Sequence, residues 1–506
     1  MDTKALRQKI LDLAIRGKLV PQDQNDEPAS VLLERIREQK KQMVKDGKLK
    51  PKDIKKDTVI FKGDDNLHYE RFADGTVKCI EDEIPFELPE GWAWTRLSTL
   101  TINRDSERKP ISAAQRTNVA KIYDYYGASG KIDKIDKYIF NEKLLLIGED
   151  GANLVTRSKP IAFFAEGQYW VNNHAHCIDS PDKCILEFLC FYINAISLEK
   201  YITGSAQPKM TQDNMNSILI ALPPYKEQQQ ISQRLDVIWS SIDKIEFEKE
   251  NVLELVDNVK SKILDLAIHG KLVPQDPNDE PASVLFERIR EEKEELIKQG
   301  KIKRDKKESV IFKGDDNSYY QDLPENWIKI RLSSISEIIT KGTTPRGGRI
   351  AYSQSGIGFL RAENIAGYDK LNLSNLNYID EESHNNYLKR SILKENDILI
   401  TIAGTLGRTG IVPQQALPLN TNQAVAIIRL VDKNIINVKY LVYAINSPQI
   451  KDDLLDKSVD VAIPNLSLEN IADCNIPFPP FAEQKRIVTA IEEAFSKLDK
   501  ISESLA

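Results

Sequence analysis

Two Pro-Pro-aromatic motifs are the first residues that could do chemistry. They are Leu222-Pro-Pro-Tyr225 and Phe478-Pro-Pro-Phe481. An amino-methyltransferase places Asp, Asn or Ser ahead of Pro-Pro-Tyr/Phe, because that side chain accepts a hydrogen bond from the target amino group. Leucine and phenylalanine accept no hydrogen bond. We therefore interpret both motifs as rigid junctions in which proline fixes φ and a helix begins just beyond.

A glycine-rich turn and a histidine–cysteine cluster are the other candidates for chemistry. Gly404-Thr-Leu-Gly-Arg-Thr-Gly410 lacks the Lys-Ser/Thr pair with which a P-loop holds phosphates and magnesium. His174-Ala-His176-Cys177, with Cys184 and Cys190 downstream, fits no standard zinc-ligand spacing, so we predict no metal site. The five histidines form no nucleophile–base pair in the sequence, and we predict a chain without catalytic residues.

Polar and basic loop residues suit a different task, which is contact with nucleic acid. Arginine pairs with guanine and Asn or Gln with adenine, whereas Lys and hydroxyl groups hold phosphates. In residues 89–222, called head 1 from here on, the candidates for DNA contact are Arg104, Arg108, Lys109, Arg116, Lys121, Ser129, Lys131, Arg157, Asn172, Asn173, His174, Gln207 and Lys209. In residues 324–478, called head 2, they are Lys341, Thr343, Thr344, Arg346, Arg349, Arg361, Asn364, Arg408, Asn422, Gln423 and Asn465.

Neither head is basic overall, but both concentrate their basic residues. Head 1 has 15 Lys and Arg against 15 Asp and Glu, and head 2 has 16 against 16. Five basic residues lie from Arg104 to Lys121 against two acidic ones, and four lie from Lys341 to Arg361 against none. We expect the loop 341–349 to be flexible and suited to a phosphate backbone. An ordinary surface loop is the alternative for each stretch, but their comparable positions in both heads favour DNA contact.

The segments that must position these loops occur twice in the sequence. Shared borders around two faintly similar heads indicate one duplicated scaffold that carries two different recognition surfaces. The repeated strings are Ile10–Asp23 and Ile263–Asp276, Asn25–Leu32 and Asn278–Leu285, Val59–Asn66 and Val310–Asn317, Leu88–Trp92 and Leu323–Trp327, and Leu222–Gln228 and Phe478–Gln484.

Apolar residues after each Pro-Pro pair follow the four-and-three spacing of a coiled coil. No Pro or Gly occurs from Tyr225 to His269, so we expect a rod of roughly 50 Å over 231–266. A partner helix is the favoured cover for this seam, and packing on its own domain is the alternative. The expected seam residues are Ile231, Leu235, Ile238, Ile242, Ile245, Val252, Val256, Val259, Ile263, Leu266, Ile487, Ile491, Leu498, Ile501 and Leu505.

The N-terminal segment supplies the half of the second seam that the C-terminal helix lacks. Leu6, Ile10 and Leu13 continue the register of the helix that ends near Leu505. This continuity predicts that the two termini meet and that the molecule is a closed ring.

The resulting prediction is an α+β fold. Two globular α/β heads are separated by two long antiparallel coiled-coil helices in a pseudo-twofold cyclic arrangement. Within the heads, Lys143–Ile147 and Asp397–Ile402 are buried-strand candidates followed by polar turns. The expected parts are 1–24, the N-terminal half of the distal helix region; 25–88, a charged insertion; 89–222, the first head; 223–276, the central helix; 277–323, a second charged insertion; 324–478, the second head; and 479–506, the distal helix.

The charged insertions are dominated by Glu, Lys, Arg and Gln over 34–57 and 287–307. We expect solvated helices followed by mobile basic turns near Gly47 and Gly300. A contact surface for partner subunits is the alternative.

Bulk composition narrows the class of protein. With 29% charged and 41% hydrophobic residues the chain is typical of a soluble globular protein, and no apolar run is long enough to span a membrane. The N-terminus has no apolar signal core and the five cysteines are few, so we expect reduced thiols and a cytoplasmic location. The net charge of −6 argues against a simple polybasic nucleic-acid binder, but a DNA reader with its basic residues on one face remains allowed.

Over essentially its whole length the chain resembles the specificity subunits of type I restriction–modification systems. The resemblance rests on two unlike heads, duplicated helices and the expected cyclic closure. It rests also on the strings Tyr126-Gly-Ala-Ser-Gly-Lys131, Ile147-Gly-Glu-Asp-Gly-Ala152, Trp170-Val-Asn-Asn-His-Ala-His176 and Gly358-Phe-Leu-Arg-Ala-Glu-Asn364, and on the two Pro-Pro junctions. The charged insertion ahead of each head is a departure from the family pattern.

The resemblance implies a non-catalytic DNA reader. Each head, a target recognition domain, would bind one half of a split site on double-stranded DNA, while the helices set the spacer and dock two methyltransferase subunits. S-adenosylmethionine, ATP and magnesium would belong to the methyltransferase and restriction subunits, and this chain would bind no cofactor itself. The alternative left open is a non-catalytic tandem adaptor whose heads hold peptide or carbohydrate.

Overall fold

The protein divides into two compact units, residues 1–248 and 249–506. The structure, a computed structural model, describes residues 2–117, 119–204, 207–302, 304, 323–346, 352–432, 435–456 and 466–505. The boundary falls inside one helix, α8 (Tyr225–Ile268), to which both units contribute. Each unit contains one head. The second copy of the repeated string, Val310–Asn317, lies outside the described residues.

Head 1 is built on two four-stranded sheets and one short ladder. The first sheet is antiparallel throughout, whereas in the second β6 and β11 are parallel. The order of the first is β10 (Ala162–Ala165), β9 (Leu144–Gly148), β12 (Ala175–Asp179), β5 (Ile102–Asn103), and that of the second is β7 (Gly130–Ile135), β6 (Tyr123–Gly127), β11 (Gln168–Val171), β8 (Phe140–Asn141). The ladder joins β13 (Leu219–Leu222) to β4 (Ala93–Arg96).

Strand β9 is the centre of the head 1 core. Leu144 to Ile147 are all apolar and all fully buried, which confirms the strand predicted over 143–147. Leu145 and Ile147 pack in one cluster with Phe188 and Tyr192 of helix α6 (Ile185–Ala195). Successive side chains of a strand point to opposite faces of the sheet, so a run in which every side chain is buried requires cover on both faces. Full burial of one such side chain stabilises the fold by about 1.5–3 kcal/mol.

Head 2 repeats the four-stranded sheet and the ladder, but its second sheet has three described strands instead of four, and its two-stranded hairpin of β17 (Ile365–Gly367) and β18 (Lys370–Leu371) has no counterpart among the described strands of head 1. Its predicted strand over 397–402 is confirmed as β20, which is fully buried. The matching sheets are β21 (Thr409–Ile411), β20 (Ile398–Thr401), β23 (Val425–Leu430), β15 (Ser336–Lys341), and β19 (Asn377–Ile379), β16 (Ile357–Leu360), β22 (Leu419–Thr421), with β16 and β22 parallel. The matching ladder joins β14 (Ile328–Arg331) to β24 (Asn475–Phe478).

The Pro-Pro motifs are the junctions that the sequence predicts. The ladder strands β13 and β24 end at Leu222 and Phe478, and the helices α8 and α14 (Phe481–Leu505) begin just beyond the prolines. A buried tryptophan–glutamate hydrogen bond of 2.9 Å locks each junction, from Trp92 to Glu227 and from Trp327 to Glu483. Burial raises the pKa of Glu227 to about 7 and also raises that of Glu483.

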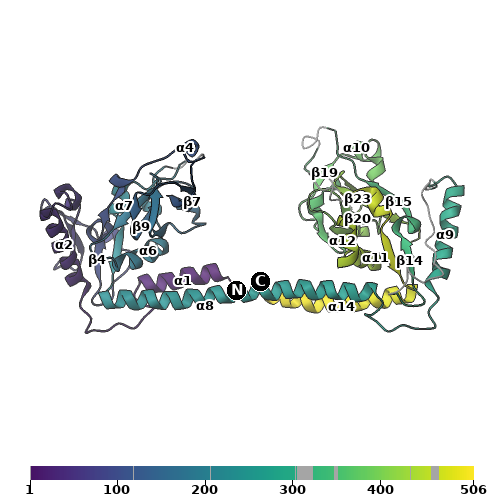
Figure 1. Ribbon diagram of the computed structural model, residues 1–506, viewed down its shortest axis with the longest axis horizontal. Coiled ribbons are helices and arrows are strands. Elements are labelled where there is room, and N and C mark those ends of the chain that lie inside the picture. The colour runs from purple at the N-terminus through teal and green to yellow at the C-terminus, as the bar shows by residue number, and fades with distance from the viewer. Residues whose placement is uncertain are drawn as a thin grey trace. The chain divides into compact units, whose positions relative to one another are not determined.

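Helix α8 has an antiparallel neighbour in each unit (Figure 1). In the first unit α1 (Thr3–Ile15) runs beside it, and Arg7 contacts Asp243 at 2.5 Å and Glu246 at 3.2 Å. In the second unit α14 runs beside it, and Lys260 contacts Asp499 at 2.6 Å. The ring closure that the sequence suggests stays a prediction.

The seam of α8 is covered in part by the heads and in part by these neighbours. Ile231 and Leu235 belong to the head 1 core, so packing on its own domain, the less favoured alternative, also occurs. Three expected seam residues depart from the expectation, because Ile245, Val259 and Ile501 are 48%, 37% and 45% exposed. Their exposure leaves apolar surface on the helices uncovered within the described chain.

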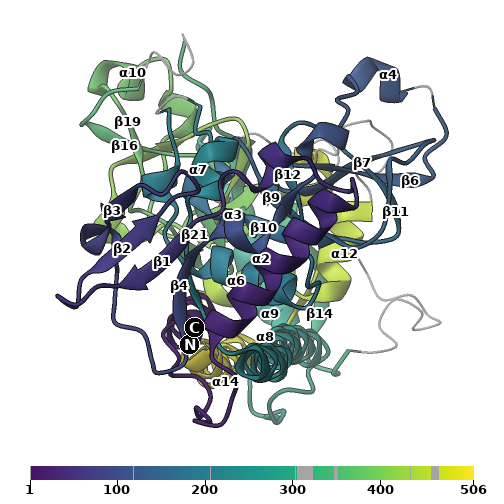
Figure 2. The same ribbon diagram turned by 90° about the vertical axis from the view of Figure 1, so that its left-hand side faces the viewer.

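The first insertion folds against its own head. It contains α2 (Ala29–Lys45) and a small antiparallel sheet of β1 (Val59–Lys62), β2 (His68–Arg71) and β3 (Val77–Cys79), with β1 beside β4 (Figure 2). The expectation of a merely solvated helix is wrong for one face of α2. Lys40 on that face is 1% exposed and donates to Asp57 at 2.7 Å and to the Ser98 carbonyl at 2.8 Å.

The second insertion repeats the helix of the first and its contact with the head. Helix α9 (Ala282–Lys298) buries Leu285 and Ile289, and Lys293 donates to the Ser333 carbonyl at 2.8 Å. The duplicated lysines are buried because each one finds a carbonyl on its own head, a contact that a count of charged residues does not reveal.

Candidate nucleic-acid interface

The same tight turn connects the two sheets in each head. It lies between β11 and β12 in head 1 and between β22 and β23 in head 2. The Asn172 side chain accepts a hydrogen bond from the His174 amide at 2.8 Å, and that of Asn422 accepts one from the Ala424 amide at 3.1 Å. Both asparagine amides also donate to a carbonyl of the parallel neighbour, β6 or β16. The exposed tips that these turns present are Asn173 and Gln423.

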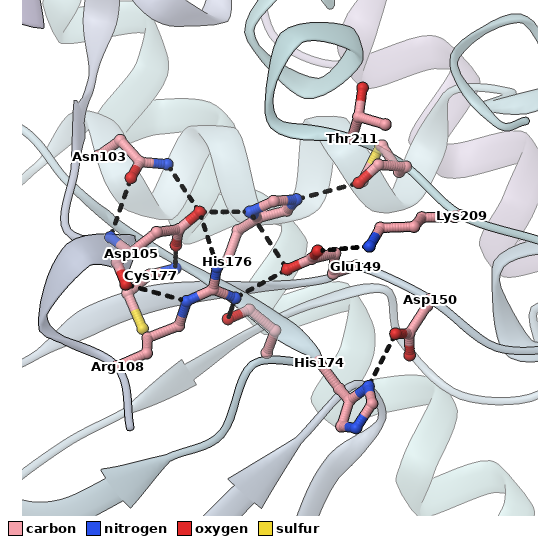
Figure 3. A network of polar contacts seen from close by, with 12 residues as sticks. Asn103, Asp105, Arg108, Glu149, Asp150, His174, His176, Cys177, Lys209 and Thr211 are labelled. Carbon is pink, nitrogen blue, oxygen red and sulfur yellow. Dashed lines mark hydrogen bonds and ion pairs between the residues drawn. The ribbon is translucent and has the colours of Figure 1, made fainter. Parts of the chain in front are cut away.

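Beside the head 1 turn lies a buried network of charged side chains (Figure 3), called the head 1 corner. Asp105 lies 2.6 Å from His176 Nδ1, and its other oxygen accepts the Cys177 amide at 2.7 Å. Arg108 donates to Glu149 at 2.8 Å. The corner joins β12 to the loop that follows β5 and to the residues that follow β9.

Charges within the head 1 corner compensate one another. Burial opposes ionisation of Asp105, but the contacts with His176 and Arg108 hold its pKa below the usual value. Burial raises the pKa of Cys177 well above its ordinary range, so this thiol is neither a nucleophile nor a metal-ready thiolate at neutral pH. The arrangement is suited to rigid positioning of polar groups.

Two predicted DNA-contact residues border the head 1 corner on its exposed side. Lys209 is 52% exposed and lies 3.2 Å from Glu149. His174 is 50% exposed and lies 2.7 Å from Asp150. The carboxylates of Glu149 and Asp150 therefore lie beside the donors that sequence reasoning selected.

The remaining basic candidates of head 1 are mostly bound to carboxylates as well. Arg104 pairs with Glu107, and Arg157 donates to three backbone carbonyls near the end of α6. Lys109 has no carboxylate within ion-pair distance in the described chain. The other paired candidates are Arg116 and Lys121, both on Asp133, and Lys131, on Asp124.

The basic stretch from Arg104 to Lys121 is therefore largely neutralised by the fold, and DNA contact by its residues stays a prediction. Each arginine in it has an acidic partner brought from elsewhere in the fold or from the next turn of the chain. Ser129 is half-buried and Gln207 is exposed.

Head 2 presents its basic residues differently. Lys341, Arg346 and Arg408 are exposed and have no carboxylate within ion-pair distance in the described part of the chain. The Arg346 guanidinium stacks over the Tyr387 ring at 4.8 Å. Arg361 is the exception among the candidates, because it pairs with Glu363.

Hydroxyl and amide groups link the start of the 341–349 loop to the head 2 turn. The Thr344 hydroxyl donates to the Gln423 carbonyl at 2.9 Å, and Arg390 donates to the Thr343 hydroxyl at 3.0 Å. These bonds anchor the start of the loop, and the expected flexibility stays a prediction for residues 347–349, which lie outside the described residues. Asn364 is buried and bonds backbone groups at both ends of its own loop. Arg349 and Asn465 lie outside the described residues.

Sequence reasoning missed Arg390, Tyr387 and the two carboxylates Glu149 and Asp150. Arg390 follows Lys389 in a polar segment that matched no string in head 1, so the comparison of repeats passed over it. The carboxylates stood in the quoted string Ile147–Ala152, but nothing in the sequence pairs them with Lys209 or His174.

The described residues also bear on metal binding and on insertion into a membrane. That part of the chain contains no group of three or more His, Cys, Asp or Glu side chains that could hold a metal ion. It also contains no helix long and apolar enough to cross a membrane. The absence of a cofactor from this chain stays a prediction.

Comparison with known proteins gives one family. The model of the type I restriction modification DNA specificity domain matches twice, over residues 89–255 and 324–505. Two relatives from Escherichia coli, the specificity subunits of the type I restriction enzymes EcoAI and EcoEI, are each 29% identical. They cover 98% and 99% of this chain, and the matches span 90% of each relative.

Solved structures include similar chains. The HsdS subunit from Thermoanaerobacter tengcongensis is 15% identical, with a TM-score of 0.40 over 83% of this chain and 93% of that chain. A chain from a study of complex assembly in the type I R-M system is also 15% identical, with a TM-score of 0.47 over 83% of this chain and 94% of that chain.

Proposed function

This chain belongs to the type I restriction modification DNA specificity domain family, and from that premise we propose that it is the non-catalytic DNA-reading subunit of a type I restriction–modification complex. Each head reads one half of a bipartite target on double-stranded DNA. The observation that carries the proposal is the double family match over two heads of one topology and unlike surface chemistry.

The helices have two roles in this proposal. The continuous helix α8 sets the spacer between the half-sites, and the helices dock two methyltransferase subunits. Support for docking comes from apolar side chains that the described chain leaves open on α8, since Val237, Phe247 and Leu255 are 59%, 60% and 61% exposed. Large exposed apolar side chains on one element are typical of a protein interface.

The rest of the complex carries the chemistry. Methyltransferase subunits bring S-adenosylmethionine, and restriction subunits bring ATP and magnesium. A cytoplasmic location is part of the same proposal. The family match favours this function over a tandem adaptor for peptide or carbohydrate.

The proposal is tested by co-expression with the cognate methyltransferase subunits and mapping of methylated adenines. The expected result is a bipartite motif with a fixed spacer, and duplex binding that weakens steeply with salt. A motif without two halves, or no binding to any duplex, would reject the function.

Spacer control needs a separate test. Insertion of seven residues into α8 adds about 10 Å of helix, so the mapped spacer should lengthen by about three base pairs while both half-sites stay the same. An unchanged spacer would reject the role of α8 but not the role of the heads.

A further inference from the structure

Head 2 contains an open pocket at the place where the head 1 corner is filled with charges. The pocket has a volume of about 570 Å³ and lies between the end of β15, the β22–β23 turn and the start of α13 (Leu468–Ala472). Its polar lining includes Lys341, Thr343, Arg390 and Gln423, and these four residues are called the anion pocket from here on. Ile402 and Leu466 supply apolar walls.

The anion pocket offers hydrogen-bond donors and no acid. None of the described residues that line it is Asp or Glu. Lys341 and Arg390 have no carboxylate within ion-pair distance in the described chain, and the only side-chain bond of Arg390 there is to the Thr343 hydroxyl. The Gln423 carbonyl already accepts the Thr344 hydroxyl, so its amide nitrogen remains to donate. Two cations beside hydroxyl and amide donors are the groups that bind a phosphate.

The backbone holds these donors in place. Lys341 is the last residue of β15 and pairs with Ala426 of β23. Gly342 packs so closely that a Cβ there would lie 2.1 Å from the Asn422 carbonyl oxygen, and the Thr343 amide donates to Thr421 at 3.1 Å. A ligand therefore meets a pocket that is already ordered, and little conformational entropy is lost on binding.

The corresponding place in head 1 has the opposite charge pattern. In the ladder register Asp105 lies level with His176, as Lys341 lies level with Ala426. Glu149 occupies the level that Ile402 holds in head 2, since the backbone amides of both residues donate to the carbonyl of the third residue of the shared turn, His174 or Ala424. Two carboxylates thus stand where head 2 has a lysine and an isoleucine.

We propose that the anion pocket binds one backbone phosphate of duplex DNA and that head 1 has no counterpart of this site. The inference rests on the proposed function, because it names a DNA group that the second head holds. It predicts unequal heads. Head 2 supplies a phosphate contact with counterion release, whereas the basic groups at the head 1 corner, Arg108 and Lys209, are already balanced by carboxylates.

The test uses the full chain assembled with its methyltransferase subunits and the duplex identified by methylation mapping. Binding is measured from low to high salt for Lys341→Ala and Arg390→Ala. Each variant should bind more weakly, and the slope of log K against log salt should become shallower by about one. The methylated motif should not change, because a phosphate contact carries no base information.

Matched variants show whether the effect belongs to this pocket. Lys209→Ala removes an exposed lysine beside the head 1 corner that is paired with Glu149, so it should change the slope less than Lys341→Ala does. Lys341→Arg keeps the charge and should keep the wild-type slope. Neutral methylphosphonate linkages can replace the phosphates of the head 2 half-site one at a time. At one position the replacement should lower the affinity of the wild type but leave the affinity of Lys341→Ala unchanged, because that variant has already lost the contact.

The possible results separate the hypotheses. An unchanged slope in both alanine variants overturns the pocket, and so does an altered half-site motif with an unchanged slope, which would make Lys341 a base reader. Inorganic phosphate that binds the free complex tightly and blocks no duplex would mean a separate anion site and would also overturn the proposal. Failure of the wild type to bind any duplex overturns the proposed function itself.

Discussion

The head 1 corner and the anion pocket of head 2 lie at the same place on the same backbone and differ in their side chains. In head 1, Asp105, Glu149 and Arg108 form a closed set of ion pairs. In head 2, Lys341 and Arg390 face an open pocket. The hydrogen bonds that hold the turn and strands are made by backbone groups and by one asparagine in each head.

This difference shows how a duplicated scaffold can carry two recognition surfaces. Backbone ladders fix the position of the turn, so side chains around it can change without loss of the fold. Where the new side chains are buried and charged they must compensate one another, and where they are exposed they remain free to bind a ligand. Head 1 and head 2 represent these two outcomes.

The largest expected effect comes from removing a carboxylate of the head 1 corner, where the charges depend on one another. Asp105→Ala leaves Arg108 and His176 without their shared carboxylate, and the unfolding free energy of the first unit should fall by about 3 kcal/mol. Urea unfolding of the full chain, followed by hydrogen exchange within head 1, measures the loss. Lys341→Ala is the control at the same place in head 2 and should change stability by less than about 0.5 kcal/mol. Equal losses of unfolding free energy in the two variants would contradict the interpretation that the head 1 corner is a closed set of ion pairs and the head 2 pocket is not.

The shared part of the scaffold should respond equally in both heads. Asn172→Ala and Asn422→Ala each remove a side-chain acceptor for a turn amide, and each should cost about 1 kcal/mol. Hydrogen exchange of the His174 and Ala424 amides measures the effect in each head separately. A large effect in one head with none in the other would show that the turns are held by different interactions.

The two strand-to-helix junctions are expected to differ in how their stability depends on pH. The folded-state pKa of Glu227 is raised to about 7 by burial, so its protonated form stabilises the fold below pH 4.5, and this stability is lost as pH rises to about 7. Glu227→Gln should remove that pH dependence and make the first unit about 1 kcal/mol more stable at pH 8. Glu483 accepts a second bond from Gln275 at 2.5 Å, so Glu483→Gln should gain less. Unfolding midpoints at pH 5 and pH 8 test both, and a gain at pH 5 equal to that at pH 8 would contradict the account.

The smallest expected effect on stability is at the edge of head 2. Arg346 is exposed and stacks on Tyr387, so Arg346→Ala should change the unfolding free energy by less than about 0.5 kcal/mol. Its effect should appear in duplex binding at low salt. Tyr387→Phe keeps the ring but removes the hydroxyl that donates to the Thr344 carbonyl at 2.9 Å, so it measures the contribution of that bond separately from the stacking. A stability loss above about 1 kcal/mol would mean that Arg346 holds the loop rather than a ligand.

Much of the architecture was available from the sequence. Repetition of long strings identified the duplicated scaffold, and the apolar run Leu144–Ile147 was a buried-strand candidate that the structure confirms as β9. The Pro-Pro pairs marked where strands end and helices α8 and α14 begin, because proline is tolerated at the start of a helix but disrupts its interior. These features are local, so a single sequence specifies them.

Charge pairing was decided only by the tertiary structure. Arg108 and Glu149 are 41 positions apart, and Arg390 and Thr343 are 47 apart. A count along the chain treats Arg108 and Lys341 alike, because it cannot tell which carboxylates the fold brings within 4 Å. The sequence determined which residues could contact DNA. The pairing of β5, β9 and β12 within head 1, and of β15, β20 and β23 within head 2, decided which cations remain free to do so.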